Sequence, residues 1–244
     1  MKRRIDQLLV ECGLFDSRAK AAAAIQAGRV TVNGRSVAKP SEAVDGDAEI
    51  EAEAAHPWVG RGALKLDHAL SLWPVAVEGR VVLDVGASTG GFTEVCLARG
   101  ARRVFAVDVG RDQLHPRLRQ DPRVVNLEAT DARDLDAVLV PEAVDVIVCD
   151  ASFIGLAKVL PPALALSAPG ADLICLVKPQ FEAGPADVGK GGLVKDEAVH
   201  TRVLVEVTAW LQTQGWVLQA VADSPIQGGE GQREYLLWAV KPLP

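Results

Sequence analysis

Two different patterns of hydrophobic and polar residues divide the chain near residue 55. From residue 62 onward, short apolar runs alternate with helical segments, which is the order of parallel strands joined by crossover helices. Helices are predicted over 62–72 and 196–214, strands near 80–85, 103–108, 123–127, 144–150 and 171–177, and a final antiparallel edge hairpin near 216–222 and 233–240. This order predicts an α/β domain built on a doubly wound, Rossmann-like parallel sheet.

The residues before this sheet have a smaller α+β pattern. Apolar residues at helical spacing stop at Gly13, and Ser17 is a suitable N-cap for a second helix that ends before Gly28. The pair Asn33-Gly34 between two short runs is a strong hairpin signal. The predicted elements are helices over 5–12 and 18–27, hairpin strands over 30–32 and 35–37, and a closing strand near 48–52.

Length and composition fit a division into two domains. The chain has 244 residues, of which 49% are hydrophobic, and this supports one large and one small domain. We expect a small domain over 1–55, a linker over 56–61 and the α/β domain over 62–244. No uncharged run reaches the ~18 residues that span a bilayer, and no signal segment follows the first residues, so we expect a cytoplasmic protein. The cysteines and histidines are scattered, which indicates reduced thiols and no metal site.

Charge is distributed unevenly within the small domain. The net charge of the chain is −6, which by itself argues against a nucleic-acid partner. Residues 1–40, however, hold eight Lys and Arg against three acids, while residues 41–55 hold six acids and no base. Because local charge sets the field that a polyanion meets, the first 40 residues are a candidate surface for nucleic acid.

The most informative motif runs from Val81 to Phe92 and predicts a buried strand, a glycine-rich turn and the start of a helix. Glycine allows bare backbone to approach a ligand. Asp108, at the end of the next apolar run, can accept hydrogen bonds from both hydroxyls of a ribose. Together they predict a bound nucleoside. The alternative is a plain strand–turn–helix link with a packing glycine.

The spacing of the glycines narrows the choice of nucleoside. The order Gly86-x-x-x-Gly90-Gly91 differs from the G-x-G-x-x-G of dinucleotide folds, and no Lys-Ser/Thr follows as in a P-loop. Asp84, two residues before the first glycine, would repel a pyrophosphate and tolerate the cationic S-adenosylmethionine. We predict that this cofactor is bound by Asp84, Gly86, Ser88, Thr89, Gly90, Gly91, Phe92, Asp108 and Asp131.

Charged residues also gather at the edge where the parallel strands end. Asp150 and Lys178 follow the fourth and fifth predicted strands, and Lys65 and Glu234 flank the same edge. Two neighbouring ammonium groups repel each other, which favours loss of a proton from one of them, and a neutral lysine can act as a general base toward a hydroxyl. We therefore predict that these four residues are catalytic. The alternative is a set of structural ion pairs.

Taken together, these motifs resemble those of the TlyA-type ribosomal RNA 2′-O-methyltransferases, whose catalytic domain is FtsJ/RrmJ-like. The resemblance spans nearly the whole chain and rests on RGxxKL from residue 61, LDVGASTGGF from 83, AVDVGRDQL from 106, DPRV from 121, DxSFI from 150, LVKPQFE from 176, GKGG from 189 and SPIQG from 224. The small domain resembles the alpha-L RNA-binding motif. In this family a Lys-Asp-Lys-Glu tetrad carries methyl transfer, and its positions fall on the four charged residues just described. The chain departs from the family pattern at Gly60, Ala63, Asp131 and Gln232.

The resemblance implies a substrate and a mechanism. It implies methylation of a ribose 2′-hydroxyl in ribosomal RNA, with Lys178 taking the hydroxyl proton. The target implied is a cytidine, and the short segment before Ile5 resembles the family form that acts on the large subunit. We expect a monomer that binds a ribosomal subunit, without a membrane or a metal. Predicted RNA contacts are Arg3, Arg4, Arg18, Lys20, Arg29 and Phe153.

Two of these expectations concern the surroundings of the target nucleotide. Phe153 is predicted to stack on the target base, and the alternative is a core phenylalanine. The glycine-rich loop over 182–196 is predicted to be mobile and to close on RNA.

Three other functions stay open on sequence grounds. A methyltransferase for a base nitrogen would want Asn/Asp-Pro-Pro-aromatic where the chain has Asp150-Ala151-Ser152-Phe153. A haemolytic activity, sometimes attached to the name of this family, would want a membrane-spanning segment or a long basic amphipathic helix. A non-catalytic assembly factor would bind RNA without transferring a methyl group.

Overall fold

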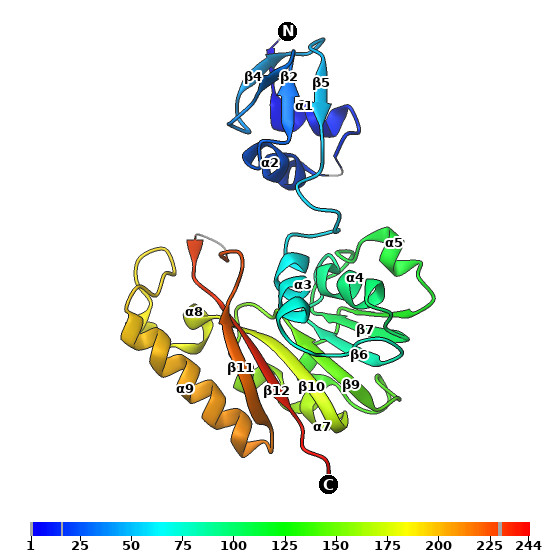
Figure 1. The fold of residues 1–244 in the computed structure, drawn as a ribbon, viewed down its shortest axis with the longest axis vertical. Coiled ribbons are helices and arrows are strands. Elements are labelled where there is room, and N and C mark those ends of the chain that lie inside the picture. The colour runs from blue at the N-terminus through cyan, green and yellow to red at the C-terminus, as the bar shows by residue number, and fades with distance from the viewer. Residues whose placement is uncertain (1, 16, 229–230) are drawn as a thin grey trace. The chain divides into compact units, whose positions relative to one another are not determined.

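The computed structural model describes residues 2–15, 17–228 and 231–244 (Figure 1). Its contacts divide the chain into two units, Met1–Pro57 and Trp58–Pro244. Each unit has its own hydrophobic core. No helix in these described ranges is both long enough and apolar enough to cross a membrane.

Unit 1 packs two helices against short strands. The helices are α1 (Ile5–Glu11) and α2 (Arg18–Gln26), and the strands are β1 (Lys2–Arg4), β2 (Val30–Val32), β3 (Arg35–Ser36), β4 (Ala43–Asp45) and β5 (Ile50–Ala52). Strand β2 lies between β3 and β5 in one antiparallel sheet, and β1 pairs with β4 in another. The Ser17 hydroxyl accepts a hydrogen bond from the Lys20 amide at 3.4 Å, which confirms the predicted cap. Ile5, Leu9 and Ile25 fill the core.

The sequence prediction for unit 1 missed two strands. The helices, the hairpin and the closing strand are confirmed within two residues, but β1 and β4 were not expected. Strand β1 consists of Lys2, Arg3 and Arg4, all of them exposed, so it has no alternation of apolar and polar residues. It is held in place by backbone pairing with β4, which a side-chain pattern does not reveal.

Unit 2 is a seven-stranded mixed sheet with helices on both faces. The strands, in spatial order, are β11 (Val217–Asp223), β12 (Tyr235–Val240), β10 (Ser167–Val177), β9 (Val144–Cys149), β6 (Val81–Val85), β7 (Arg103–Asp108) and β8 (Val124–Glu128). The helices are α3 (Ala63–Leu72), α4 (Gly91–Ala98), α5 (Pro116–Arg119), α6 (Leu156–Val159), α7 (Pro161–Ala165), α8 (Pro179–Glu182) and α9 (Glu197–Thr213), with short 3-10 turns at η1 (Ala132–Asp134) and η2 (Pro185–Asp187).

Successive residues of the central strand enter different cores. Leu83 packs in the core that includes Val203 of α9, whereas Val82 packs in the core that includes Leu66 of α3 and Val95 of α4. This alternation is what a sheet covered on both faces requires. The doubly wound prediction is therefore confirmed, with helices α3 and α4 on one face and α9 on the other (Figure 1).

The sheet confirms the predicted edge hairpin and differs from the prediction in one detail. Strand β12 lies antiparallel between β10 and β11, so the sheet is mixed, as the hairpin required. Strand β10 begins at Ser167 rather than 171, with a register shift between Ser167 and Asp172. Pro169-Gly170 interrupts the apolar run there and hid the earlier start.

The order of the strands fixes where a ligand can bind. Chain order reverses at β6, since β7 lies on one side of it and β9 on the other. The loops that follow β6 and β9 therefore diverge at the carboxyl ends of the strands, which is where open α/β sheets bind their ligands. Because β12 runs antiparallel, it is the beginning of that strand that reaches this edge.

Candidate active site

The turn after β6 needs glycine at its first position. Gly86 has φ +83°, and a Cβ placed on it would lie 2.9 Å from Cα of Ala151, in the loop after β9. That contact is with backbone, which cannot move aside easily. Gly90, with φ +94°, is the N-cap of α4, and a Cβ placed on it would collide with side chains of α5 and of the segment before α5. The two loops therefore touch at Gly86, and the glycine motif is explained by geometry.

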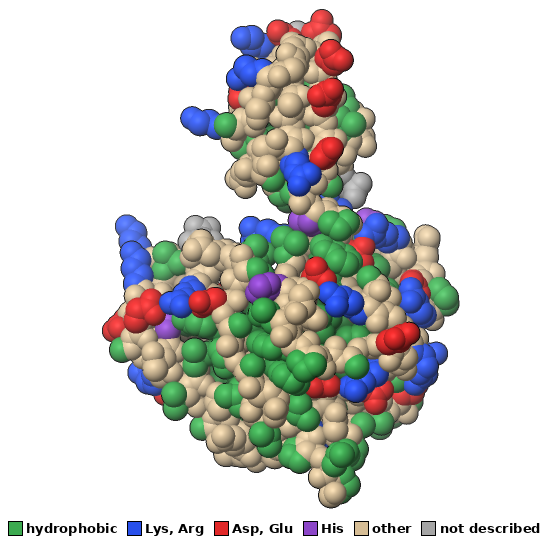
Figure 2. Space-filling model, in the orientation of Figure 1, with side chains coloured by type: hydrophobic (Ala, Val, Ile, Leu, Met, Phe, Trp, Pro, Cys, Tyr) green, Lys and Arg blue, Asp and Glu red, His purple; other side chains and the backbone are tan. Residues whose placement is uncertain are grey.

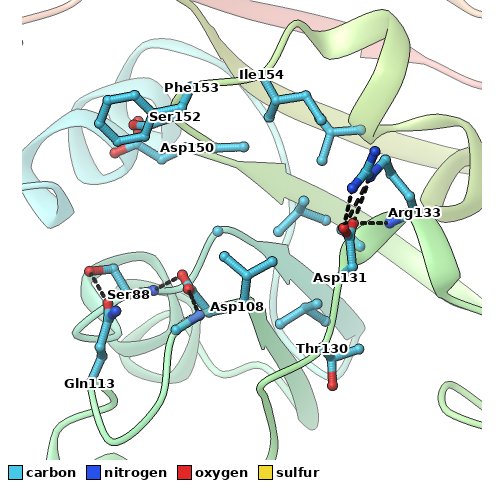
Figure 3. A pocket seen from close by; sticks show the side chains of 18 residues that line it. Ser88, Asp108, Gln113, Thr130, Asp131, Arg133, Asp150, Ser152, Phe153 and Ile154 are labelled. Atoms are coloured by element: carbon cyan, nitrogen blue, oxygen red, sulfur yellow. Dashed lines mark hydrogen bonds and ion pairs between the residues drawn. The ribbon is translucent and has the colours of Figure 1, made fainter.

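A cavity of about 560 Å³ opens between these two loops (Figure 3). Asp108 and Asp131 lie on one side of it, and Phe153 and Ile154 on the other. Asp108 Oδ2 accepts a hydrogen bond from the Ser88 amide at 2.8 Å, and its Oδ1 accepts from the Gly110 amide at 2.7 Å. These bonds fix the carboxylate at the end of β7, facing the cavity.

Asp131 is held in place by Arg133, two residues further along the chain. Its carboxylate forms a salt bridge with Arg133, with 2.6 Å between Nη2 and Oδ2, and accepts from the Arg133 amide at 2.9 Å. The hydrogen bond from the Arg133 side chain holds the pKa of Asp131 below its usual range. Asp131 is therefore a hydrogen-bond acceptor on the cavity wall.

A second hollow, of about 220 Å³, shares Gly86, Ser88, Asp150 and Ser152 with the first. The predicted residues Thr89, Gly91 and Phe92 line this second hollow together with the segment over 60–62. Gly91 allows a close approach, because a Cβ there would lie 2.9 Å from the Ala63 amide nitrogen of α3. The glycine turn therefore borders both hollows and keeps them next to Asp150.

Asp84 lies beneath the turn and lines neither of these two hollows. It is fully buried, and its Oδ2 accepts a hydrogen bond from the Thr93 hydroxyl at 2.6 Å. Its Oδ1 has no hydrogen-bond partner. Burial raises the pKa of Asp84 to about 7. Among the predicted cofactor residues, Asp84 and Gly90 thus support the turn from behind, while the others border the hollows.

The four predicted catalytic residues come together in one chain of contacts. Lys178 Nζ lies 2.7 Å from Asp150 Oδ1. Lys65 Nζ lies 3.3 Å from Asp150 Oδ2 and 2.6 Å from Glu234 Oε2. Lys65, Lys178 and Glu234 are 7%, 5% and 4% exposed. The Asp150 carboxylate thus lies between the two ammonium groups that were predicted to be neighbours. The two positive and two negative charges of the four groups balance.

Lys178 has two further partners that complete its surroundings. Its Nζ donates to the Asp150 carbonyl oxygen at 3.0 Å and to Ser152 Oγ at 2.8 Å. The sequence assigns no role to Ser152, because its spacing does not show which side chain it meets. It also lines both hollows, which places Lys178 close to the proposed cofactor and substrate space.

Phe153 is 89% exposed, so the alternative of a core phenylalanine is wrong. Its backbone has φ +67°, a left-handed conformation that is uncommon for a bulky residue. Its ring lies 5.2 Å from that of Phe181. The Glu182 carboxylate accepts a hydrogen bond from the Leu156 amide at 2.8 Å and anchors the loop just beyond Phe153. The loop therefore presents an aromatic ring at the rim of the cavity (Figure 3).

The predicted RNA-binding arginines of unit 1 are engaged with acids. Arg4 and Arg18 both contact the buried carboxylate of Asp6, at 3.0 and 2.7 Å. Hydrogen bonds from these arginines lower the pKa of Asp6 to about 2. Arg3 pairs with Glu11 and Arg29 with Glu53. On the face seen in Figure 2, basic side chains of unit 1 gather toward one flank and acidic ones toward the other. The arginine side chains remain about half exposed in these pairs.

The strand order, the glycine turn and the acid at the end of β7 define an α/β protein of the class I methyltransferase type, with a nucleoside site at the carboxyl ends of the strands. Comparison with known proteins agrees. The chain matches the FtsJ-like methyltransferase family over residues 58–241 and the S4 domain over residues 3–50.

Individual relatives match over nearly the full chain. The 16S/23S rRNA (cytidine-2′-O)-methyltransferase TlyA of Mycobacterium tuberculosis is 46% identical over 239 residues, which are 97% of this chain and 89% of the relative. Hemolysin A of Brachyspira hyodysenteriae is 36% identical over 96% of this chain and 98% of its own. A solved structure described as a hemolysin from Streptococcus thermophilus is 39% identical, has a TM-score of 0.79 and covers 99% of this chain and 89% of that chain.

The chain belongs to the FtsJ-like methyltransferase family and carries an S4 domain in its N-terminal part. The predictions of a methyltransferase, of S-adenosylmethionine as its cofactor and of the TlyA-type resemblance are confirmed.

Proposed function

We propose that this protein transfers the methyl group of S-adenosylmethionine to the 2′-hydroxyl of a cytidine ribose in ribosomal RNA. The observation that carries the proposal is the buried chain of contacts from Lys178 through Asp150 and Lys65 to Glu234, next to the cavity at the glycine turn. The relative named for cytidine 2′-O-methylation, which matches over almost the whole chain, supports this choice of nucleophile.

The residues of the cavity suit the cofactor. Asp108 presents a fixed carboxylate at the end of β7, where the two ribose hydroxyls of a nucleoside are usually bound. Asp131 can accept from the amino group of adenine, and Gly86 keeps the wall free of side chains. When bound, S-adenosylmethionine supplies a methyl group on a cationic sulfur. The volume of about 560 Å³ is in the range of small-molecule sites.

Lys178 is the residue we assign as general base. In its neutral form, Nζ takes the proton of the ribose hydroxyl as the oxygen becomes nucleophilic. The new ammonium group is stabilised by the Asp150 carboxylate, 2.7 Å away, and donates to Ser152. Lys65 contacts two carboxylates, those of Asp150 and Glu234. It therefore holds Asp150 in position and leaves Lys178 to exchange the proton.

Recognition of RNA is assigned to two regions. In unit 1, Arg3, Arg4, Arg18, Lys20 and Arg29 would contact phosphates. At the rim of the cavity, Phe153 is exposed enough to stack on a base that is turned out of its helix. With a ribosomal subunit as partner, we expect the protein to act in the cytoplasm as a monomer, without a metal ion.

The hemolysin names of two relatives do not define a separate candidate. This chain shares more identity with the relative named as an rRNA methyltransferase than with either of them, over a comparable share of the sequence. The described chain also has no helix that could span a membrane.

The experiment is transfer of a radiolabelled methyl group to 50S and 30S subunits from a strain that lacks the modification. We expect a labelled cytidine 2′-O-methyl group in large-subunit RNA, mapped by mass spectrometry. Labelling of the 30S subunit as well would extend the substrate to both subunits, as the name of the mycobacterial relative states for that protein. If the wild-type enzyme binds RNA but labels neither subunit, the proposal fails and an assembly factor is favoured.

A further inference from the structure

A buried polar network joins helix α9 to the segment that carries Glu234. His200 of α9 is 3% exposed, and the mechanism above gives it no role. Its Nε2 lies 2.9 Å from the Val194 carbonyl oxygen, and its Nδ1 lies 2.8 Å from the Tyr235 hydroxyl. A carbonyl oxygen can only accept, so Nε2 carries a proton. In the neutral ring Nδ1 then accepts from Tyr235.

The network continues from Val194 to the other side of Glu234. The Val194 amide donates to Gln232 Oε1 at 3.1 Å, and Gln232 is 2% exposed. The Gln232 carbonyl oxygen in turn accepts from the Gly228 amide at 2.8 Å. Gly228 forms a wall against the catalytic acid, because a Cβ placed on it would collide with Glu234 Oε1. We call His200, Val194, Gln232 and Tyr235 the His200 network.

The His200 network thus fixes both flanks of Glu234. Gln232 lies two residues before it, Tyr235 directly follows it, and both are tied to His200, directly or through Val194. The Glu234 carboxylate between them accepts a hydrogen bond from Lys65 Nζ at 2.6 Å. Buried polar networks in which every member is satisfied hold a single geometry, since any shift leaves a donor or acceptor unpaired.

The network also anchors the glycine-rich loop. Val194 belongs to the segment between α8 and α9, which includes Lys190 and Lys195. A salt bridge holds the earlier part of the same segment, because Arg202 Nη2 of α9 lies 2.6 Å from Asp187 Oδ2. The position of this loop and the position of Glu234 therefore both depend on contacts with the N-terminal half of α9.

We propose that His200 is a positioning residue for methyl transfer, which holds Glu234 against Lys65 through Tyr235 and through Val194 and Gln232. This inference rests on the proposed function of the tetrad. It assigns His200 no contact with the cofactor or the substrate, and neither hollow described above is lined by a member of the network.

Three variants separate the two bonds of the imidazole. His200→Leu removes both. His200→Gln keeps an amide donor near the position of Nε2 for the Val194 carbonyl, and His200→Asn keeps an acceptor near the position of Nδ1 for Tyr235. For each, we would measure kcat on the ribosomal substrate, the Kd of S-adenosylmethionine by calorimetry, and Tm.

The control is Ser167→Ala, at the opposite edge of the sheet. Ser167 is buried, its hydroxyl donates to the Leu164 carbonyl oxygen at 2.6 Å, and Lys241 contacts it from the other side. Its loss removes a buried hydrogen bond of the same unit without touching the site. It should lower Tm and leave kcat unchanged.

We expect His200→Leu to lower kcat about 10- to 100-fold, because a displacement of about 1 Å in a catalytic group can cost that much. The Kd of S-adenosylmethionine should stay within about twofold. His200→Gln should recover most of kcat, because it keeps the hydrogen bond to the Val194 carbonyl oxygen and thereby the link to Gln232. A wild-type kcat in His200→Leu would overturn the inference. So would a fall in kcat in Ser167→Ala that matches the fall in His200→Leu at equal Tm.

Lys65→Ala, assayed alongside, separates this inference from the proposed function. If Lys65→Ala abolishes transfer and His200→Leu does not impair it, only the inference fails. If Lys65→Ala keeps full transfer, the tetrad assignment fails, and the role of His200 fails with it.

Discussion

The arginines predicted to bind RNA in unit 1 and the four residues predicted to be catalytic in unit 2 pair their charges in different environments. In unit 1, arginines such as Arg3 and Arg29 meet acids on the surface and stay about half exposed. In unit 2, Lys65 and Lys178 meet Asp150 and Glu234 in a site where three of the four residues are at most 7% exposed. Exposed pairs contribute about 0–1 kcal/mol each, whereas breaking a buried pair costs about 3–5 kcal/mol.

This difference separates two uses of charge. A half-exposed arginine can leave its carboxylate for an RNA phosphate at little cost, so an ion pair on the surface does not exclude a role in binding. A buried lysine cannot change partners in this way, so its contacts fix the geometry of the site. Asp6 is intermediate, because its buried carboxylate holds two arginines that are themselves exposed.

The largest effect is expected for Lys178→Met, which removes the proposed base and keeps most of the side-chain volume. Transfer should fall about 10²- to 10⁴-fold, with little change in the Kd of S-adenosylmethionine. Single-turnover methyl transfer at saturating cofactor measures it. Lys241→Met, at the far edge of the sheet, is the control and should be as active as the wild type. Equal activity of Lys178→Met would place the base elsewhere.

The comparison of buried and exposed pairs is tested by Glu234→Gln against Glu42→Gln. Glu42 pairs with Arg35 on the surface of unit 1. Glu234→Gln should lower the unfolding free energy of unit 2 by up to about 3 kcal/mol, since Asp150 still faces Lys65, and Glu42→Gln should change unit 1 by less than about 1 kcal/mol.

Urea unfolding can be followed separately in the two units. All five tryptophans lie in Trp58–Pro244, so their fluorescence reports unit 2 alone. Methyl NMR signals of Ile5 and Ile25 report the core of unit 1. Equal losses in the two variants would remove the distinction between the two kinds of pair.

The lowered pKa of Asp6 predicts how the stability of unit 1 depends on pH. Its pKa is lowered to about 2 in the folded protein, so the stabilisation is complete above the usual value near 4 and is lost as the pH falls toward 2. Asp6→Asn should therefore destabilise unit 1 at pH 7, and the difference from the wild type should shrink toward pH 2. Unfolding followed by the Ile5 and Ile25 signals measures it. A difference that is independent of pH would contradict the ion pair as its cause.

The smallest expected effect is on the salt dependence of RNA binding. Each phosphate contact contributes about 0.7–0.9 to the slope of log K against log salt concentration. Arg18→Ala should lower the slope for binding ribosomal RNA by about that amount, whereas Arg35→Ala, outside the predicted contacts, should leave it unchanged. If both variants lowered the slope equally, binding would follow net charge and not the predicted surface.

The sequence predicted the framework of unit 2 because side-chain pattern and backbone order agree there. Apolar runs mark β6, β7, β9 and β10, and the polar residues after them had to meet at one edge, which is how Asp150 and Lys178 were found. Glu234 was found through its position at the beginning of the predicted final strand. The sequence did not reveal the hydrogen-bond partners of these catalytic candidates, because contacts such as that between Lys178 and Ser152 depend on how loops fold.

Other parts of the molecule left no signal in the pattern. Strand β1 has three basic residues and no apolar one, so only its pairing with β4 reveals it. Asp84 was expected to face the cofactor, but its side chain points to the face of the sheet that α4 covers, where it meets Thr93. The acids that pair with the arginines of unit 1 come from distant positions, such as Glu53 for Arg29, and local charge counts do not show them.

The antiparallel course of β12 has a consequence for when the enzyme becomes active. Lys65 and Glu234 are 169 residues apart in sequence, and Glu234 reaches Lys65 only after β12 has inserted between β10 and β11. A nascent chain that ends before residue 234 lacks the last of the four proposed catalytic residues, whereas the residues of the glycine turn have already been made. If the proposed role of Glu234 holds, competence for methyl transfer is tied to the insertion of β12, the last strand to be synthesised.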